Sequence, residues 1–172
     1  LYEQFNSNEY RLLVNKHNVQ IDNNEYLIGY VTAEELLNAI APKNAENKRI
    51  LYPDIFKNNI RLYLGETTVN KNIEKTLKEE PDKFHLYNNG LTITTKEILH
   101  KLENYLISSV NIVNGCQTAN SIYNVFKNDS GKESEVKVPV KIIIADDEEY
   151  EKITIRTNSQ NGISEKELVS IK

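Results

Sequence analysis

The fold of this chain is decided by residues 105–126, which read YLISSVNIVNGCQTANSIYNVF. Residues 105–113 are rich in apolar and β-branched side chains, a pattern that favours a β-strand. After the turn Asn114-Gly115, apolar residues recur at the three- and four-residue spacing of one helix face. The members of that face are Ala119, Ile122, Tyr123 and Phe126. The stretch therefore predicts a strand, a tight turn and a helix in succession.

Further strands and helices are predicted on both sides of this unit. Strand patterns cover residues 9–21, 26–31 (a buried strand), 55–64, 84–87, 91–95 and 138–144, with a hairpin turn between the runs 84–87 and 91–95. Helix patterns lie between Thr32 and Pro42, over residues 68–80, from Asp146 toward Arg156, and from Ser164 onward. The mixture predicts an α+β fold with a mixed sheet and packed helices.

The composition narrows the class of protein. The 172 residues fit one domain, in which residues 1–58 supply N-terminal strands and a helix and residues 59–172 form a core with polar turns. The net charge of −4 disfavours a broad DNA-binding surface. The single cysteine excludes an internal disulfide and a multi-cysteine metal site, and it fits a reducing cytoplasm. No apolar run approaches the roughly 20 residues that span a bilayer, so no membrane partner is expected.

The two ends of the sequence lead to a further interpretation. The chain starts at Leu1, contains no methionine, and stops within a polar stretch. We therefore interpret it as a fragment of a longer protein.

Three turns combine asparagine with glycine, glutamine or threonine and are candidates for ligand binding. They comprise Asn88, Asn89 and Gly90, then Asn114, Gly115, Gln117 and Thr118, and finally Asn158 and Gln160 within residues 157–161. A glycine at a strand-to-helix turn lets the backbone approach a ligand, and the helix N-terminus offers N–H donors to an anion. Each turn alone is also typical of a structural role, namely a hairpin turn, a helix cap and a helix C-terminus.

The sequence does not identify catalytic residues. Arg61, the run Asn70-Lys71-Asn72 and Arg156 supply cations near the polar turns, and Arg61 is either a phosphate clamp or a solvated strand residue. Metal-ligand spacing is absent from the histidines, which are His17, His85 and His100. No nucleophile elbow or Walker loop is present. Cys116 is either a reactive thiol at a helix start or a small buried residue.

Five segments occur in a recognisable order. They are NIRLYLG at residues 59–65, VNKNI at 69–73, FHLYNNGLTI at 84–93, IVNGCQT at 112–118 and TNSQN at 157–161. In this order they resemble the abortive-infection phage-resistance (AIPR) family, and the resemblance covers residues 24–170. It implies a role in bacterial phage defence, with other phage-defence proteins as partners.

A weaker resemblance concerns the nucleotide-binding core of the ParB/sulfiredoxin superfamily, which has the same order of strands, turns and helices from residue 105 onward. It implies that Gly115, Gln117 and Thr118 lie at the phosphates of a nucleotide. It further implies that Asn158 and Gln160 lie at the phosphate edge or at Mg²⁺, which would accompany the nucleotide. The superfamily usually supplies arginine or histidine where this chain has Cys116-Gln117-Thr118.

The leading expectation is a phage-defence module that binds a nucleotide or a nucleic-acid end through the polar turns. One alternative is a phosphohydrolase that cleaves nucleotides or nucleic acid, with Arg61 or Lys71 stabilising charge. Another is a protein-interaction scaffold in which the turns are only structural. Both hypotheses that involve a ligand require the turns near residues 60, 89, 115 and 159 to converge on one concave surface.

Overall fold

The larger of two sheets is built around a long central strand. The computed structural model describes residues 10–23, 25–56 and 68–159. The five-stranded sheet has the order β2-β3-β8-β4-β7, and the three-stranded sheet has the order β1-β6-β5. The strands are β1 Leu12–Asn15, β2 Val19–Asp22, β3 Tyr26–Thr32, β4 Leu91–Thr95, β5 Glu97–His100, β6 Asn104–Ser108, β7 Asn111–Asn114 and β8 Lys137–Ile144.

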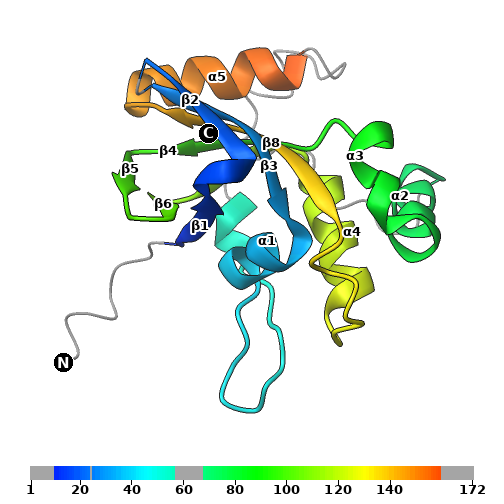
Figure 1. Cartoon of the computed structure of the whole chain (residues 1–172). Helices are drawn as coiled ribbons and strands as arrows, with labels where there is room; N and C mark the ends of the chain where they lie inside the picture. Colours follow the sequence, from blue (N-terminus) through cyan, green and yellow to red (C-terminus); the bar gives the residue numbers. More distant parts are fainter. Residues whose placement is uncertain (1–9, 24, 57–67, 160–172) are drawn as a thin grey trace.

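Helices cover both faces of the larger sheet (Figure 1). They are α1 Ala33–Ile40, α2 Thr68–Glu79, α3 Phe84–Tyr87, α4 Cys116–Phe126 and α5 Asp147–Ser159, with short 3-10 helices η2 Lys16–Asn18, η3 Pro53–Phe56 and η4 Pro81–Lys83. In Figure 1, α1 and α4 lie on one side of this sheet and α5 on the other. β8 pairs in parallel with β4 and antiparallel with β3. The prediction of an α+β fold with a mixed sheet is therefore confirmed.

The core forms where α1 and α4 pack against the larger sheet. Along β8 the side chains alternate, so that Val138, Val140 and Ile142 are buried on this face. The helices contribute fully or almost fully buried residues, which are Leu36, Leu37, Ile40, Ala119, Ile122 and Phe126. This core fixes the start of α4 relative to the ends of β4 and β7, where the polar turns lie.

The predicted start of α1 is confirmed in detail. The Thr32 hydroxyl accepts a bond from the Glu35 backbone N–H at 3.1 Å, and the Glu35 carboxylate accepts one from the Thr32 backbone N–H at 2.8 Å. Two N–H groups that the first helical turn leaves without partners are thus satisfied.

The prediction of a strand at residues 84–87 was wrong, because this segment is the short helix α3. Pro81 opens the 3-10 helix η4 immediately before it, which sets the chain into helical geometry. Phe84 is buried, whereas His85, Leu86 and Tyr87 are exposed. The burial of Phe84 therefore anchors this single helical turn. The turn Asn88–Gly90 consequently joins a helix to a strand and is not a hairpin.

Other predicted boundaries also differ from the structure. The single strand predicted at 105–113 is two strands in different sheets, since Ser109 adopts φ 51° between β6 and β7. Residues 9–21 hold β1 and most of β2, separated by η2. The buried strand predicted at 26–31 is present as β3, but only Leu27 and Val31 are buried in it and Ile28 is exposed. Ile55 and Phe56 belong to a 3-10 helix, while residues 57–64 and the helix predicted from 164 lie outside the described residues.

Candidate functional site

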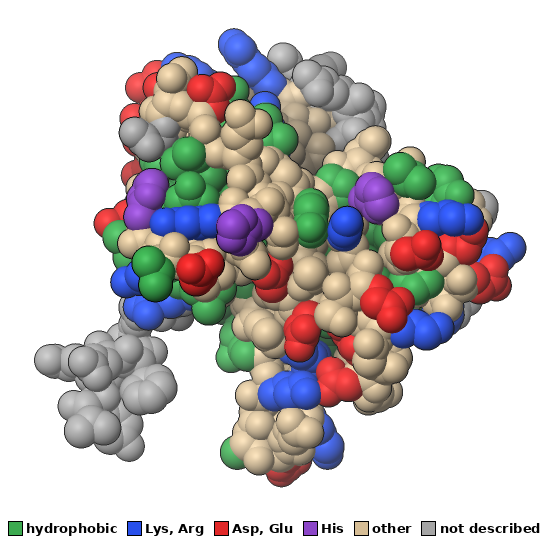
Figure 2. All heavy atoms as spheres, viewed as in Figure 1, with side chains coloured by type: hydrophobic (Ala, Val, Ile, Leu, Met, Phe, Trp, Pro, Cys, Tyr) green, Lys and Arg blue, Asp and Glu red, His purple; other side chains and the backbone are tan. Residues whose placement is uncertain are grey.

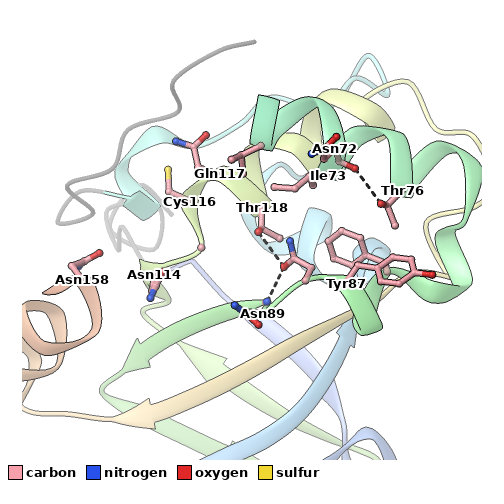
Figure 3. Close-up of a pocket in the computed structure, with 15 residues that line it drawn as sticks. Asn72, Ile73, Thr76, Tyr87, Asn89, Asn114, Cys116, Gln117, Thr118 and Asn158 are labelled. Carbon is pink, nitrogen blue, oxygen red and sulfur yellow. Dashed lines mark hydrogen bonds between the residues drawn. The ribbon is translucent and has the colours of Figure 1, made fainter. Parts of the chain in front are cut away.

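A pocket of about 420 Å³ lies where two of the polar turns meet the ends of α2, α3 and α5. We call it the polar-turn pocket (Figure 3), and its lining consists of Val69, Asn72, Ile73, Thr76, Phe84, Tyr87, Asn88, Asn89, Gly90, Asn114, Gly115, Cys116, Gln117, Thr118 and Asn158. Of the four turns predicted to converge, those near residues 89 and 115 and the described part of the one near 159 line one concave surface, and the turn near residue 60 lies outside the described residues. Asn158 reaches the pocket from the last turn of α5, because that helix continues to Ser159 rather than ending at Thr157.

Two glycines explain how the turns approach so closely. Gly90 has φ 74°, and a Cβ atom there would lie 1.9 Å from the carbonyl oxygen of Pro139 in β8. Gly115 has φ 95°, and a Cβ atom there would lie 2.6 Å from the carbonyl oxygen of Gly90. Both positions combine a left-handed backbone with a neighbouring backbone atom inside side-chain distance. Only glycine fits both requirements, so the two turns stack directly on each other.

The side chain of Asn88 is fixed by two internal hydrogen bonds. Its Oδ1 accepts from the Gly90 backbone N–H at 2.7 Å and from the Thr118 hydroxyl at 3.2 Å. Because a backbone N–H can only donate, the amide atom that faces it must be the oxygen. Thr118, expected as a ligand donor, therefore donates its hydroxyl hydrogen to Asn88 and orients that amide.

Asn158 is almost completely buried at the junction of α5 and β7. Its Nδ2 donates to the carbonyl oxygens of Val113 at 3.2 Å and Thr154 at 2.8 Å. The neighbouring Asn114 donates through Nδ2 to the carbonyl oxygen of Thr157 at 3.5 Å, a long bond. These contacts tie the end of α5 to the strand that leads into the pocket, so both asparagines are structural as well as pocket-lining.

The part of the pocket that the structure describes is lined by neutral side chains. Lys71 and Arg156 are exposed and lie outside the lining, and Asn70 is buried and also outside it. Arg61 and Gln160 fall outside the described residues. On the face seen in Figure 2, acidic and basic side chains alternate over the surface rather than gather in one basic patch.

One wall of the pocket was not predicted from the sequence. This wall consists of Ile73 and Thr76 from α2 with Phe84 and Tyr87 from α3. Phe84 is 1% exposed and anchors α3, whereas Tyr87 is 61% exposed. The wall could not be predicted because residues 84–87 have no helical period of their own. Val69, within the helix predicted over residues 68–80, is 62% exposed at the rim.

Cys116 lies at the first position of α4, where its side chain is buried. The Asn120 amide nitrogen approaches its sulfur at 3.3 Å and its carbonyl oxygen at 3.0 Å. Within residues 10–23, 25–56 and 68–159, no group of three or more histidine, cysteine, aspartate or glutamate side chains is arranged to hold a metal ion. None of the helices in the same ranges is long and apolar enough to cross a membrane.

The fold and the site define an α+β protein with a neutral, amide-lined pocket beside the N-terminus of a helix. In a comparison with family models, residues 56–172 match the family described as AIPR protein. This match covers more than half of the chain, and the chain belongs to the AIPR family. Comparisons with curated proteins and with solved structures found no match. Family membership indicates a role in phage defence.

Proposed function

We propose that this chain is a sensing module of phage defence, acting in the cytoplasm, that binds a nucleotide or a nucleic-acid end in the polar-turn pocket. The observation that carries this proposal is the convergence of the Asn88, Asn114 and Asn158 segments on one cavity. Its volume of about 420 Å³ falls within the roughly 300–1,000 Å³ common for small-molecule sites.

The two walls of the pocket suit the two parts of a nucleotide. The polar wall holds the start of α4, which begins without a side-chain cap and whose N-terminal dipole favours an anion. The opposite wall offers apolar and aromatic surface from Ile73, Phe84 and Tyr87. An exposed aromatic ring such as that of Tyr87 is a stacking surface for a base.

The neutral lining favours binding over catalysis. General acid–base chemistry needs a group that changes protonation near neutral pH, and the described lining offers amides, hydroxyls and a thiol. The alternative, a phosphohydrolase, relies on Arg61 or Lys71 to stabilise charge. Lys71 is exposed and outside the lining, and Arg61 lies outside the described residues. Mg²⁺, if it enters with a nucleotide, would be held largely by the phosphates and water, because the described lining includes no carboxylate.

The likeness to the ParB/sulfiredoxin core remains part of this proposal. It is supported by the succession β7, turn, α4, β8, α5 and by the position of Asn158 at the pocket. Other phage-defence proteins are the partners to which a ligand signal would pass.

A thermal-shift screen of the four ribonucleoside triphosphates, with and without Mg²⁺, tests the proposal. Binding raises the melting temperature by mass action, and chromatography of the same mixtures detects any cleavage product. A shift without product is the expected result, and a shift with product would instead establish the phosphohydrolase. If no nucleotide or oligonucleotide raises the melting temperature, and Asn88→Ala retains phage protection, the proposal fails and the hypothesis of a protein-interaction scaffold is supported.

A further inference from the structure

The hydrogen bonds inside the polar-turn pocket leave a donor on one side and an acceptor on the other. Asn88 uses its Oδ1 for the bonds from Gly90 and Thr118, which Figure 3 marks by dashed lines. Its Nδ2 has no hydrogen bond to any described residue, and Asn88 lines the pocket. The Asn88 side therefore presents N–H donors beside the N-terminus of α4.

Asn158 has the opposite arrangement. Its Nδ2 must face the carbonyl oxygens of Val113 and Thr154, because carbonyl oxygens can only accept. Its Oδ1 is left without a partner among the described residues, although the residue is only 1% exposed and lines the pocket. Figure 3 shows this oxygen directed from the end of α5 toward the pocket. A ligand that covers this oxygen removes its remaining contact with water, and must supply a donor to offset that desolvation.

Asn114 reinforces the acceptor side. Its Nδ2 is turned toward the carbonyl oxygen of Thr157, which leaves its Oδ1 as the atom available to the pocket. The orientations of the Asn88, Asn114 and Asn158 amides are thus set by hydrogen bonds within the protein. The orientations of these groups are therefore fixed before a ligand binds.

We infer that the polar-turn pocket is polarised, so that its ligand binds in one direction. A phosphate or other anionic acceptor lies at Asn88 and the start of α4, and a hydroxyl or amino donor of the same ligand faces Asn158. This inference rests on the proposed function and specifies it. The ligand class is a nucleotide-like molecule with phosphate at one end and a neutral donor at the other, and the Asn158 side rejects phosphate because its oxygens repel an anion.

Asn88→Asp tests the donor side with little change of shape. One carboxylate oxygen keeps the bonds from Gly90 and Thr118, while the other replaces the N–H donor by an anion. Gln20→Glu is the matched control, since it makes the same chemical change at an exposed side chain of β2. β2 and β7 are opposite edges of the larger sheet, so this control lies far from the pocket.

The measurement is isothermal titration calorimetry with the four ribonucleoside triphosphates and the corresponding nucleosides. We expect Asn88→Asp to weaken triphosphate binding at least about tenfold, the loss of one hydrogen bond to a charged group, and to change nucleoside binding far less. Gln20→Glu should bind both like the wild type. If the wild type binds no nucleotide, the proposed function itself fails. If Asn88→Asp binds triphosphate as well as the wild type does, only the polarity is overturned.

The acceptor side is tested with the wild-type protein alone, so the outcome does not depend on whether a variant folds. The probes are analogues of the tightest-binding nucleotide that lack one donor each: the 2′-deoxy form, the 3′-deoxy form and the form without the exocyclic amine. A buried acceptor left without its donor strongly disfavours the analogue. At least one analogue should therefore lose about tenfold or more in affinity. Equal binding of all of them would overturn the inference.

Discussion

Gly90→Ala and Gly131→Ala form a matched pair that tests how the polar turns are held together. Both glycines have left-handed backbones, with φ 74° and 81°, so alanine costs each about 1–2 kcal/mol from the backbone alone. They differ in their surroundings. A Cβ atom at Gly90 would lie 1.9 Å from the carbonyl oxygen of Pro139, whereas nothing lies within 4 Å of one at Gly131.

The difference between the two variants gives the cost of moving the Gly90 turn away from β8. Overpacking a tight site adds about 1–3 kcal/mol, so Gly90→Ala should lose about 2–5 kcal/mol and Gly131→Ala about 1–2 kcal/mol. Urea unfolding followed by circular dichroism measures both free energies of unfolding. If the two variants lose the same stability, the close backbone contact between Gly90 and β8 does not hold, and the reasoning about the pocket's construction is refuted.

Three further predictions concern the stability of the fold. Thr32→Ala should lower the free energy of unfolding by about 0.5–2 kcal/mol through loss of the α1 cap, and Thr32→Ser should restore most of it; urea unfolding checks both. Asn158→Ala should cost about 1–3 kcal/mol by the same assay, because a buried carbonyl of β7 loses its donor. Hydrogen bonds from Lys43, and then from Arg49, hold the pKa of Asp129 below the ordinary value of an aspartate, although burial opposes them. A carboxyl group with a depressed pKa contributes stability above about pH 4, and this contribution is lost as the pH falls. Asp129→Asn should therefore flatten the acid side of a plot of unfolding free energy against pH. An unchanged plot would contradict this prediction.

The elements with strong periodicity could be predicted from the sequence. The strand, Asn114-Gly115 turn and helix succession is present as β7 and α4, because a β-branched run and a helical stripe meet at a glycine. The β-branched run at 138–144 and the capped helix after Thr32 are present for similar local reasons. Local chemistry decides such elements, so one sequence suffices to place them.

The elements that depend on distant contacts could not be predicted. α3 is a single turn held by the burial of Phe84 and the preceding Pro81, and a four-residue segment carries no period. The chain breaks at Ser109, and β6 belongs to a second sheet because it pairs with β1 and β5. For the same reason the α3 wall of the pocket was missed while the asparagine turns were found.

The convergence of the turns was a prediction from chemistry rather than from geometry. Asparagine beside glycine marked residues 88–90 and 114–115, and asparagine with threonine and glutamine marked residues 157–161. In the structure the first two turns meet through Gly90 and Gly115, and Asn158 lines the same pocket. The roles of individual side chains were less predictable. Thr118 orients Asn88 instead of offering its proton to a ligand, which only the folded hydrogen-bond pattern reveals.

The most direct test of the binding pocket is a two-dimensional ¹H–¹⁵N NMR titration of the protein with the ribonucleoside triphosphates. We expect the backbone amide signals of residues 88–90, 114–118 and 158 to shift together with one binding curve, while those of β2 and β5 stay unchanged. Signals that do not move at any nucleotide concentration, or that move mainly at residues remote from these segments, would contradict it.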